Sequence, residues 1–202
     1  VVIEMSGSVQ WIANGGWIEG ITFRRPKMSS GKDLPSSPML DLTACGKIDM
    51  IHSVFDNDGS TGPVGHLTGS GNKGTWREVV FRNGGSAGLH IDGDEKVEVE
   101  LVGCVIRGNR SDGLVATNKA SKFKFINCTV ESNEGYGIRL ATGGCQAGLR
   151  ESQFKDNIAG VIKKEPHCSV TSSGNVAFLT VKPKKHIPGF KLMLLKQDPP
   201  IF

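Results

Sequence analysis

Residues 125–140 read FINCTVESNEGYGIRL and contain the clearest copy of a repeat that runs through most of the 202-residue chain. An apolar anchor residue precedes a turn that contains asparagine, and a glycine then opens a short apolar stretch. Equivalent anchors follow one another at spacings of 32, 26, 25, 24 and 24 residues. They are Phe23, Phe55, Phe81, Ile106, Val130 and Phe154. Repeats of this length indicate a solenoid, in which each coil buries its apolar side chains against its neighbours.

The positions two, five and seven residues before each anchor carry apolar or small side chains in nearly every coil. A step of two residues keeps side chains on one face of a strand, whereas the step of three between the minus-five and minus-two positions does not. Two residues must therefore bend the chain there, so that both strands face one interior. With the glycine-opened strand, each coil has three strands. The sequence predicts an all-β fold, a single-stranded right-handed parallel β-helix of about six to seven coils.

An immunoglobulin-like sandwich is the alternative, but it gives no reason for a fixed register. We expect the β-helix to span residues 1–181 and a C-terminal cap or tail to span residues 182–202. The apolar stretch FKLMLL at residues 190–195 would cover the open end of the solenoid, whose strand edges are otherwise unpaired. The alternative for this stretch is a peptide that binds a partner.

Charge and hydropathy limit the classes of partner. The formal net charge is +4, and acidic residues are interleaved with the basic ones along the predicted coils. Nucleic acid is therefore not an expected partner, because it would call for a basic stripe with aromatic residues. No stretch reaches the roughly 18 apolar residues that span a bilayer, so we expect no membrane association.

The five cysteines form an odd set without the spacing of a metal site. We interpret them as reduced thiols that serve as small apolar residues, with Cys104 and Cys128 stacked in adjacent coils. This predicts an intracellular location, cytoplasmic or nuclear. The chain opens with strand-like residues and has neither an initiator Met nor a signal peptide, so we expect it to be part of a larger protein.

The asparagine turn followed by a glycine-opened strand resembles the repeat of the pectin-lyase-like superfamily, also described as the carbohydrate-binding and sugar-hydrolase (CASH) repeat. The resemblance covers about residues 17–164. Secreted members cleave acidic polysaccharides, whereas intracellular eukaryotic members, such as some F-box proteins and spindle-associated scaffold proteins, use the repeat for binding. Loosely spaced coils and reduced cysteines make this chain more similar to the second branch. The resemblance implies a non-catalytic binding or scaffold module that presents a sheet face or loop edge to a protein or glycan.

In the enzymes of this superfamily, catalysis takes place on the outer side of the glycine-opened sheet. The corresponding outward positions here give five candidate binding residues. They are Asp41, His66, His90, Asp92 and Arg139. His90, Asp92 and Arg139 follow the register of the repeat, and Asp41 and His66 extend the row to earlier coils. In the last coil the same spacing predicts Ile162 and Lys164 as outward residues.

The alternative function is a carbohydrate-active enzyme of the polysaccharide lyase or glycoside hydrolase type, acting around His90 and Asp92. A trio of His90, Asp92 and Arg139 would supply a base, a group that orients it, and an anion clamp. Two carboxylates about 5–10 Å apart in a cleft would favour this enzyme, but we expect no second carboxylate in register beside Asp92. The turn formed by residues 92–95 lacks the spacing of a calcium-binding loop. We therefore assign no catalytic residue, no cofactor and no metal.

Overall fold

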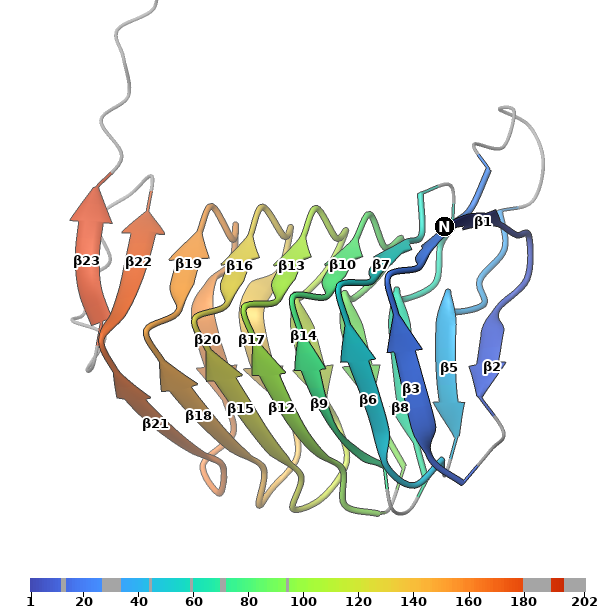
Figure 1. The fold of residues 1–202 in the computed structure, drawn as a ribbon. Helices are drawn as coiled ribbons and strands as arrows, with labels where there is room; N and C mark the ends of the chain where they lie inside the picture. Colours follow the sequence, from blue (N-terminus) through green and yellow to red (C-terminus); the bar gives the residue numbers. More distant parts are fainter. Residues whose placement is uncertain are drawn as a thin grey trace, which may run out of the picture.

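A computed structural model of the chain describes residues 1–11, 14–26, 34–43, 45–58, 60–69, 72–93, 95–179 and 190–194. In this part of the chain, 23 strands form three parallel sheets, and consecutive strands belong to different sheets except for the last two. The coils lie side by side along one axis (Figure 1). The structure confirms the predicted parallel β-helix with three strands per coil.

The three sheets are named A, B and C, and a regular coil passes from B to C to A. Sheet A contains nine strands: β1 (Val2–Glu4), β4 (Thr22–Arg24), β7 (Val54–Asp56), β10 (Val80–Arg82), β13 (Val105–Arg107), β16 (Thr129–Glu131), β19 (Gln153–Lys155), β22 (Asn175–Leu179) and β23 (Phe190–Leu194). Sheet B contains seven: β2 (Val9–Trp11), β5 (Leu40–Thr43), β8 (Gly65–Thr68), β11 (Leu89–Ile91), β14 (Leu114–Ala116), β17 (Tyr136–Leu140) and β20 (Gly160–Lys164). Sheet C also contains seven: β3 (Gly16–Glu19), β6 (Ile48–Ile51), β9 (Lys73–Arg77), β12 (Glu98–Val102), β15 (Lys122–Ile126), β18 (Gln146–Arg150) and β21 (Ser169–Ser173).

The interior is built from the anchor and its preceding positions, in the register that the repeat predicts. Each anchor pairs with the anchor of the next coil, from Phe23 to Phe154. The rings of Phe23, Phe55 and Phe81 stack with centroid distances of 5.3 and 5.4 Å. Phe125 is fully buried, and its partners in the two adjacent coils are Leu101 and Leu149.

The predicted two-residue bend between sheets C and A is present in each coil. Its second residue has a positive φ of 47–66°, the left-handed conformation that turns the chain. In the first six coils the backbone N–H of this residue donates to the next coil, as from Glu78 to the carbonyl of Val102 at 2.9 Å. The seven residues in this position are Gly20, His52, Glu78, Gly103, Asn127, Glu151 and Gly174.

Buried asparagines line the turn between sheets A and B. The Nδ2 of Asn109 donates to Oδ1 of Asn133 at 2.7 Å, and Nδ2 of Asn133 donates to Oδ1 of Asn157 at 2.8 Å. Asn83, in the corresponding turn of an earlier coil, does not join this ladder. It follows its anchor by two residues instead of three, so Gly84 takes the ladder position and donates its N–H to Asn109.

The structure places Cys104 and Cys128 in adjacent coils, because Val105 pairs with Thr129. Both thiols are buried, which confirms the predicted stack on the interior side. A hydrogen bond with Cys128, together with burial, raises the pKa of Cys104. All five cysteines are buried free thiols: Cys45, Cys104, Cys128, Cys145 and Cys168.

The C-terminal segment is described only in part. Strand β23 pairs in parallel with β22 and extends sheet A by one strand, at the end of the solenoid drawn in red (Figure 1). The other residues of 182–202 lie outside the described part, so the boundary at residue 181 and the capping role stay predictions. In the part that the structure describes, no helix has the length and apolar character needed to cross a membrane.

Phe125→Ala should lower the free energy of unfolding by about 3–5 kcal/mol, because the cavity it leaves lies between two coils that cannot close on it. Urea denaturation followed by circular dichroism measures the change. Lys124→Ala, on the outer face of the same strand, is the control and should change stability by less than about 0.5 kcal/mol. A loss below about 1 kcal/mol for Phe125→Ala would show that the register is wrong.

Asn133→Ala should cost at least about 2 kcal/mol, because it removes the acceptor of two buried donors, the backbone N–H and Nδ2 of Asn109, at about 1–3 kcal/mol for each unsatisfied group. The same denaturation experiment measures it. Gln153→Ala removes an exposed amide one coil away and should be nearly neutral. Equal stability of the two variants would contradict a structural role for the asparagine ladder.

Candidate functional site

The outer face of sheet B carries one row of polar side chains, because apolar and polar residues alternate along its strands. In β11, Leu89 and Ile91 are buried and His90 between them points outward. The register pairs Asp41 with His66 and His66 with His90. The structure therefore confirms that Asp41 and His66 extend the row to the two coils before His90.

His66 is the centre of a contact group on this face. Its Nδ1 lies 3.4 Å from Oδ1 of Asp41, and its Nε2 lies 3.0 Å from Oδ1 of Asp92, which directly follows β11. The Nε2 of His90 lies 4.0 Å from Oδ2 of Asp92. We call these four residues, Asp41, His66, His90 and Asp92, the His/Asp cluster.

The cluster contains a second carboxylate that the sequence analysis did not place near Asp92. Asp41 stands in the row of His66 and not in that of Asp92. The register within one row therefore could not indicate that the two carboxylates lie on either side of the same imidazole. The imidazole of His66 bridges the two rows and contacts a carboxylate at each nitrogen. Two carboxylates thus flank one ring on the face of a sheet.

Hydroxyl groups hold both carboxylates of the cluster. Thr43 donates to Oδ1 of Asp41 at 3.2 Å, and the hydroxyl of Thr68 hydrogen-bonds with Asp92. The four side chains of the cluster are 23–36% exposed. They are thus partly shielded from water and open to a ligand from outside.

Burial and neighbouring charges shift two of the cluster's pKa values. For Asp92, burial raises the pKa, but the hydrogen bond and charge of His66 and the hydrogen bond of Thr68 outweigh it and leave the pKa lowered. For His90, burial lowers the pKa, and the charges of His66 and Arg139 add to this against the opposite effect of Asp92. At neutral pH, Asp92 is therefore a carboxylate and His90 a neutral imidazole.

Arg139 lies apart from the cluster. Val115 stands between His90 and Arg139 in the row. The Nε of Arg139 lies 2.6 Å from Oδ2 of Asp112, whose side chain is only 5% exposed. The structure therefore does not assemble His90, Asp92 and Arg139 into a trio, because a buried carboxylate already engages the guanidinium.

The last coil continues the row with a different residue from the one predicted. Arg139 pairs with Lys163, so Lys163 stands in the row in place of Ile162 and Lys164. The reason is that Gly160 pairs with Tyr136 and not with Gly137. The glycine that opens this strand is therefore one position earlier than in the preceding coils.

The cluster has the side chains of a metal site, which the sequence analysis did not recognise. Among the described residues, His66, His90 and Asp92 each offer a ligand atom, and the three atoms lie within 4.8 Å of one another. Their sequence separations match no short metal-binding motif. The available signal was the register, which puts two histidines in the same position of successive coils.

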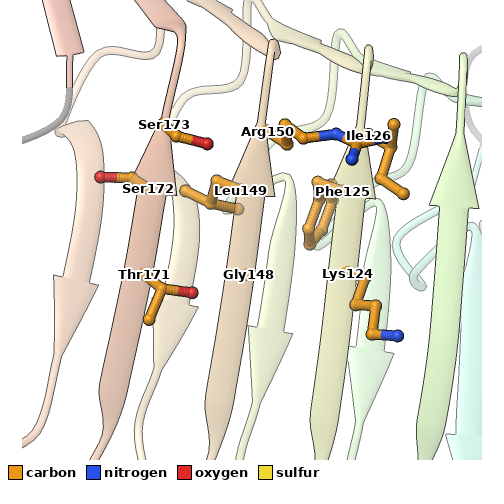
Figure 2. Close-up of a pocket in the computed structure, with 9 residues that line it drawn as sticks. All are labelled: Lys124, Phe125, Ile126, Gly148, Leu149, Arg150, Thr171, Ser172 and Ser173. Carbon is orange, nitrogen blue, oxygen red and sulfur yellow. The ribbon is translucent and has the colours of Figure 1, made fainter.

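A shallow hollow of about 350 Å³ lies on the outer face of sheet C (Figure 2). Gly148 stands between Lys124 and Thr171 in register, and its missing side chain opens the space. Arg150 and Ser173 lie at one end of this hollow (Figure 2). This hollow was not predicted from the sequence, although the outward position six residues before the anchor Phe154 is a glycine in this coil.

A comparison with curated proteins found no match to this chain. A comparison with protein families found one match, to the family described as the right-handed beta helix region, over residues 41–182. The match covers well over half of the chain, and the three parallel sheets agree with it. The chain therefore belongs to the right-handed beta helix family.

Proposed function

We propose that this chain is a non-catalytic binding module that presents the outer face of sheet B to a glycan. The observation that carries the proposal is the His/Asp cluster. It offers carboxylates and imidazoles in successive coils, about 4.8 Å apart. An extended glycan that lies along the solenoid axis would meet one polar side chain in each of the three coils from Asp41 to His90. The lowered pKa of Asp92 keeps it an acceptor for sugar hydroxyls.

A glycan suits this face better than a protein. Protein interfaces have an apolar centre with large anchoring side chains. The large apolar side chains that are exposed in the described part of the chain all lie outside the row of sheet B. They are Val1, Val2, Ile3, Trp17, Leu34 and Ile158. The face would thus bind mainly by hydrogen bonds, and a protein or scaffold partner is the competing outcome of the experiment below.

The enzyme alternative draws on the two carboxylates of the cluster, but their environment favours binding. A glycosidase needs one carboxyl group whose raised pKa keeps it protonated as the general acid. The pKa of Asp92 is shifted in the opposite direction. Asp41 and Asp92 are also both engaged by the same imidazole. This arrangement orients His66 and leaves neither carboxylate free to flank a scissile bond.

The proposal is tested by affinity electrophoresis in gels that contain polygalacturonate or a neutral glycan. His90→Ala and Asp92→Ala should weaken retention at least about tenfold, the equivalent of 1.4 kcal/mol. Both should change the free energy of unfolding by less than about 0.5 kcal/mol, since the two side chains are partly exposed. Trp17→Ala and Gly148→Ala, on sheet C, are the controls and should retain full binding.

The same proteins are assayed for new reducing ends and for unsaturated products, with and without Ca²⁺. We expect no turnover by the unsubstituted chain. If the unsubstituted chain turns over a glycan, and Asp92→Ala abolishes this turnover without changing the melting temperature, the chain is an enzyme and the binding-module proposal is wrong. If the immobilised chain retains a protein partner but no glycan, the proposal that its ligand is a glycan is contradicted.

We also propose that the protein works in a reducing compartment, the cytoplasm or nucleus. The odd number of cysteines, all five of which are buried as small apolar residues, supports this. Cys104 and Cys128 stand in adjacent coils, near enough for a disulfide to form in an oxidising environment, so their state reports on the compartment. Alkylation under native, non-reducing conditions followed by denaturation and mass spectrometry should find Cys104 and Cys128 unpaired. A disulfide between them would contradict the intracellular location.

A further inference from the structure

We propose that His66, His90 and Asp92 form a binding site for one divalent transition-metal ion of the Zn²⁺ type, on the outer face of sheet B. The three ligand atoms would be Nε2 of each histidine and a carboxylate oxygen of Asp92. The inference goes beyond the proposed glycan binding and does not depend on it, because it rests on the donor atoms alone.

The distances between the ligand atoms suit such an ion. Zn²⁺ is bound by imidazole nitrogen and carboxylate oxygen at about 2.0–2.2 Å, which places the ligand atoms of a tetrahedral site roughly 3.4 Å apart. In the structure, Nε2 of His66 lies 3.0 Å and Nε2 of His90 lies 4.0 Å from oxygens of Asp92. The three ligand atoms all lie within 4.8 Å of one another. Small side-chain rotations would bring them around one ion.

The groups around the ligands are arranged as in protein zinc sites. Metal-bound histidines usually donate their other ring N–H to a carboxylate, which fixes the tautomer and orients the ring. Asp41 lies 3.4 Å from Nδ1 of His66 and is itself held by Thr43. This contact would place the proton of His66 on Nδ1 and leave Nε2 free to bind the ion. Thr68 holds the ligand carboxylate of Asp92 in the same way.

The donor set selects the class of ion. Two imidazoles and one carboxylate favour Zn²⁺ and its neighbours over Ca²⁺ and Mg²⁺, which prefer oxygen ligands. Three protein ligands leave a fourth position open, as in zinc sites that bind water or a substrate. The partly exposed cluster would direct that position toward the solvent.

The experiment is a titration of the full chain, freed of metal by dialysis against a chelator, with Zn²⁺ in competition with a chromophoric indicator. We expect one Zn²⁺ per chain. Asp41→Asn should weaken binding about 10–100-fold, as other losses of an orienting carboxylate do. His66→Ala and His90→Ala should weaken it further, because each removes a ligand. Excess Ca²⁺ should not displace the ion.

His52 provides a matched control. Its Nε2 lies 3.2 Å from Oε2 of Glu78, so it is a second exposed histidine–carboxylate pair. His52→Ala should leave the affinity for Zn²⁺ unchanged. Circular dichroism verifies that each variant is folded, and His66→Gln and His90→Gln replace any alanine variant that is not.

Co²⁺ in place of Zn²⁺ gives a spectroscopic test that separates the cluster from the cysteines. We expect visible d–d bands without the intense charge-transfer band of thiolate ligands. The proposal is overturned by a thiolate band, by the absence of stoichiometric binding, or by binding that persists when His66 and His90 are both replaced. Glycan retention measured in chelator and in Zn²⁺ reports on the proposed function separately, so either proposal can fail alone.

Discussion

Parallel pairing without offset places each side chain directly above and below the side chains at the same position of the neighbouring coils. In an interior row this pairing favours similar side chains in successive coils, because identical shapes stack well at the spacing of the strands. The rings of Phe23, Phe55 and Phe81 are nearly parallel, with interplanar angles of 11° and 10°. A buried amide is likewise satisfied by the same amide in the next coil, as Asn133 is by Asn157. The choice of side chain at one position of a row therefore depends on the side chains at the same position of the neighbouring coils.

On the outer faces the same constraint has the opposite effect, because like charges about 4.8 Å apart repel. At some positions opposite charges face each other in adjacent coils: Glu100 pairs with Lys124 on sheet C, and Arg107 with Glu131 on sheet A. At other positions like groups are paired, as Arg82 with Arg107 on sheet A. The adjacent histidines of sheet B belong to this second group. Their repulsion is avoided while at least one ring is neutral, which agrees with the lowered pKa of His90.

The interior could be predicted from the sequence because its rows are long and chemically uniform. The anchors and the position occupied by Phe125 were found from spacing alone and lie where expected. The prediction of outward positions was wrong where one coil differs by a single residue in the spacing between its anchor and its glycine-opened strand. The early Gly160 shifts Lys163 into the outward row, in place of Ile162 and Lys164. Such errors are local, because the next buried anchor restores the register.

The contacts between rows could not be predicted from the repeat. Register fixes which residue lies above which, but the direction of a side chain across the face depends on its rotamer and on the turn that follows. Asp92 reaches sideways to His66, and Asp112 reaches Arg139. The first contact assembles the His/Asp cluster, and the second removes Arg139 from it. The candidate residues were therefore accessible from the sequence, whereas their grouping required the structure.

This separation of rows has a consequence for how a function can arise on the fold. The interior rows provide most of the stability, because their side chains are fully buried, whereas His66 and His90 on the outer face of sheet B are only partly buried. A substitution on the face therefore changes the chemistry offered to a ligand without disturbing the coils beneath it. Two histidines in successive coils suffice to place two imidazoles side by side, and one acidic residue at the end of a strand adds a third donor. The regular spacing of a solenoid supplies the geometry that other folds obtain from converging loops.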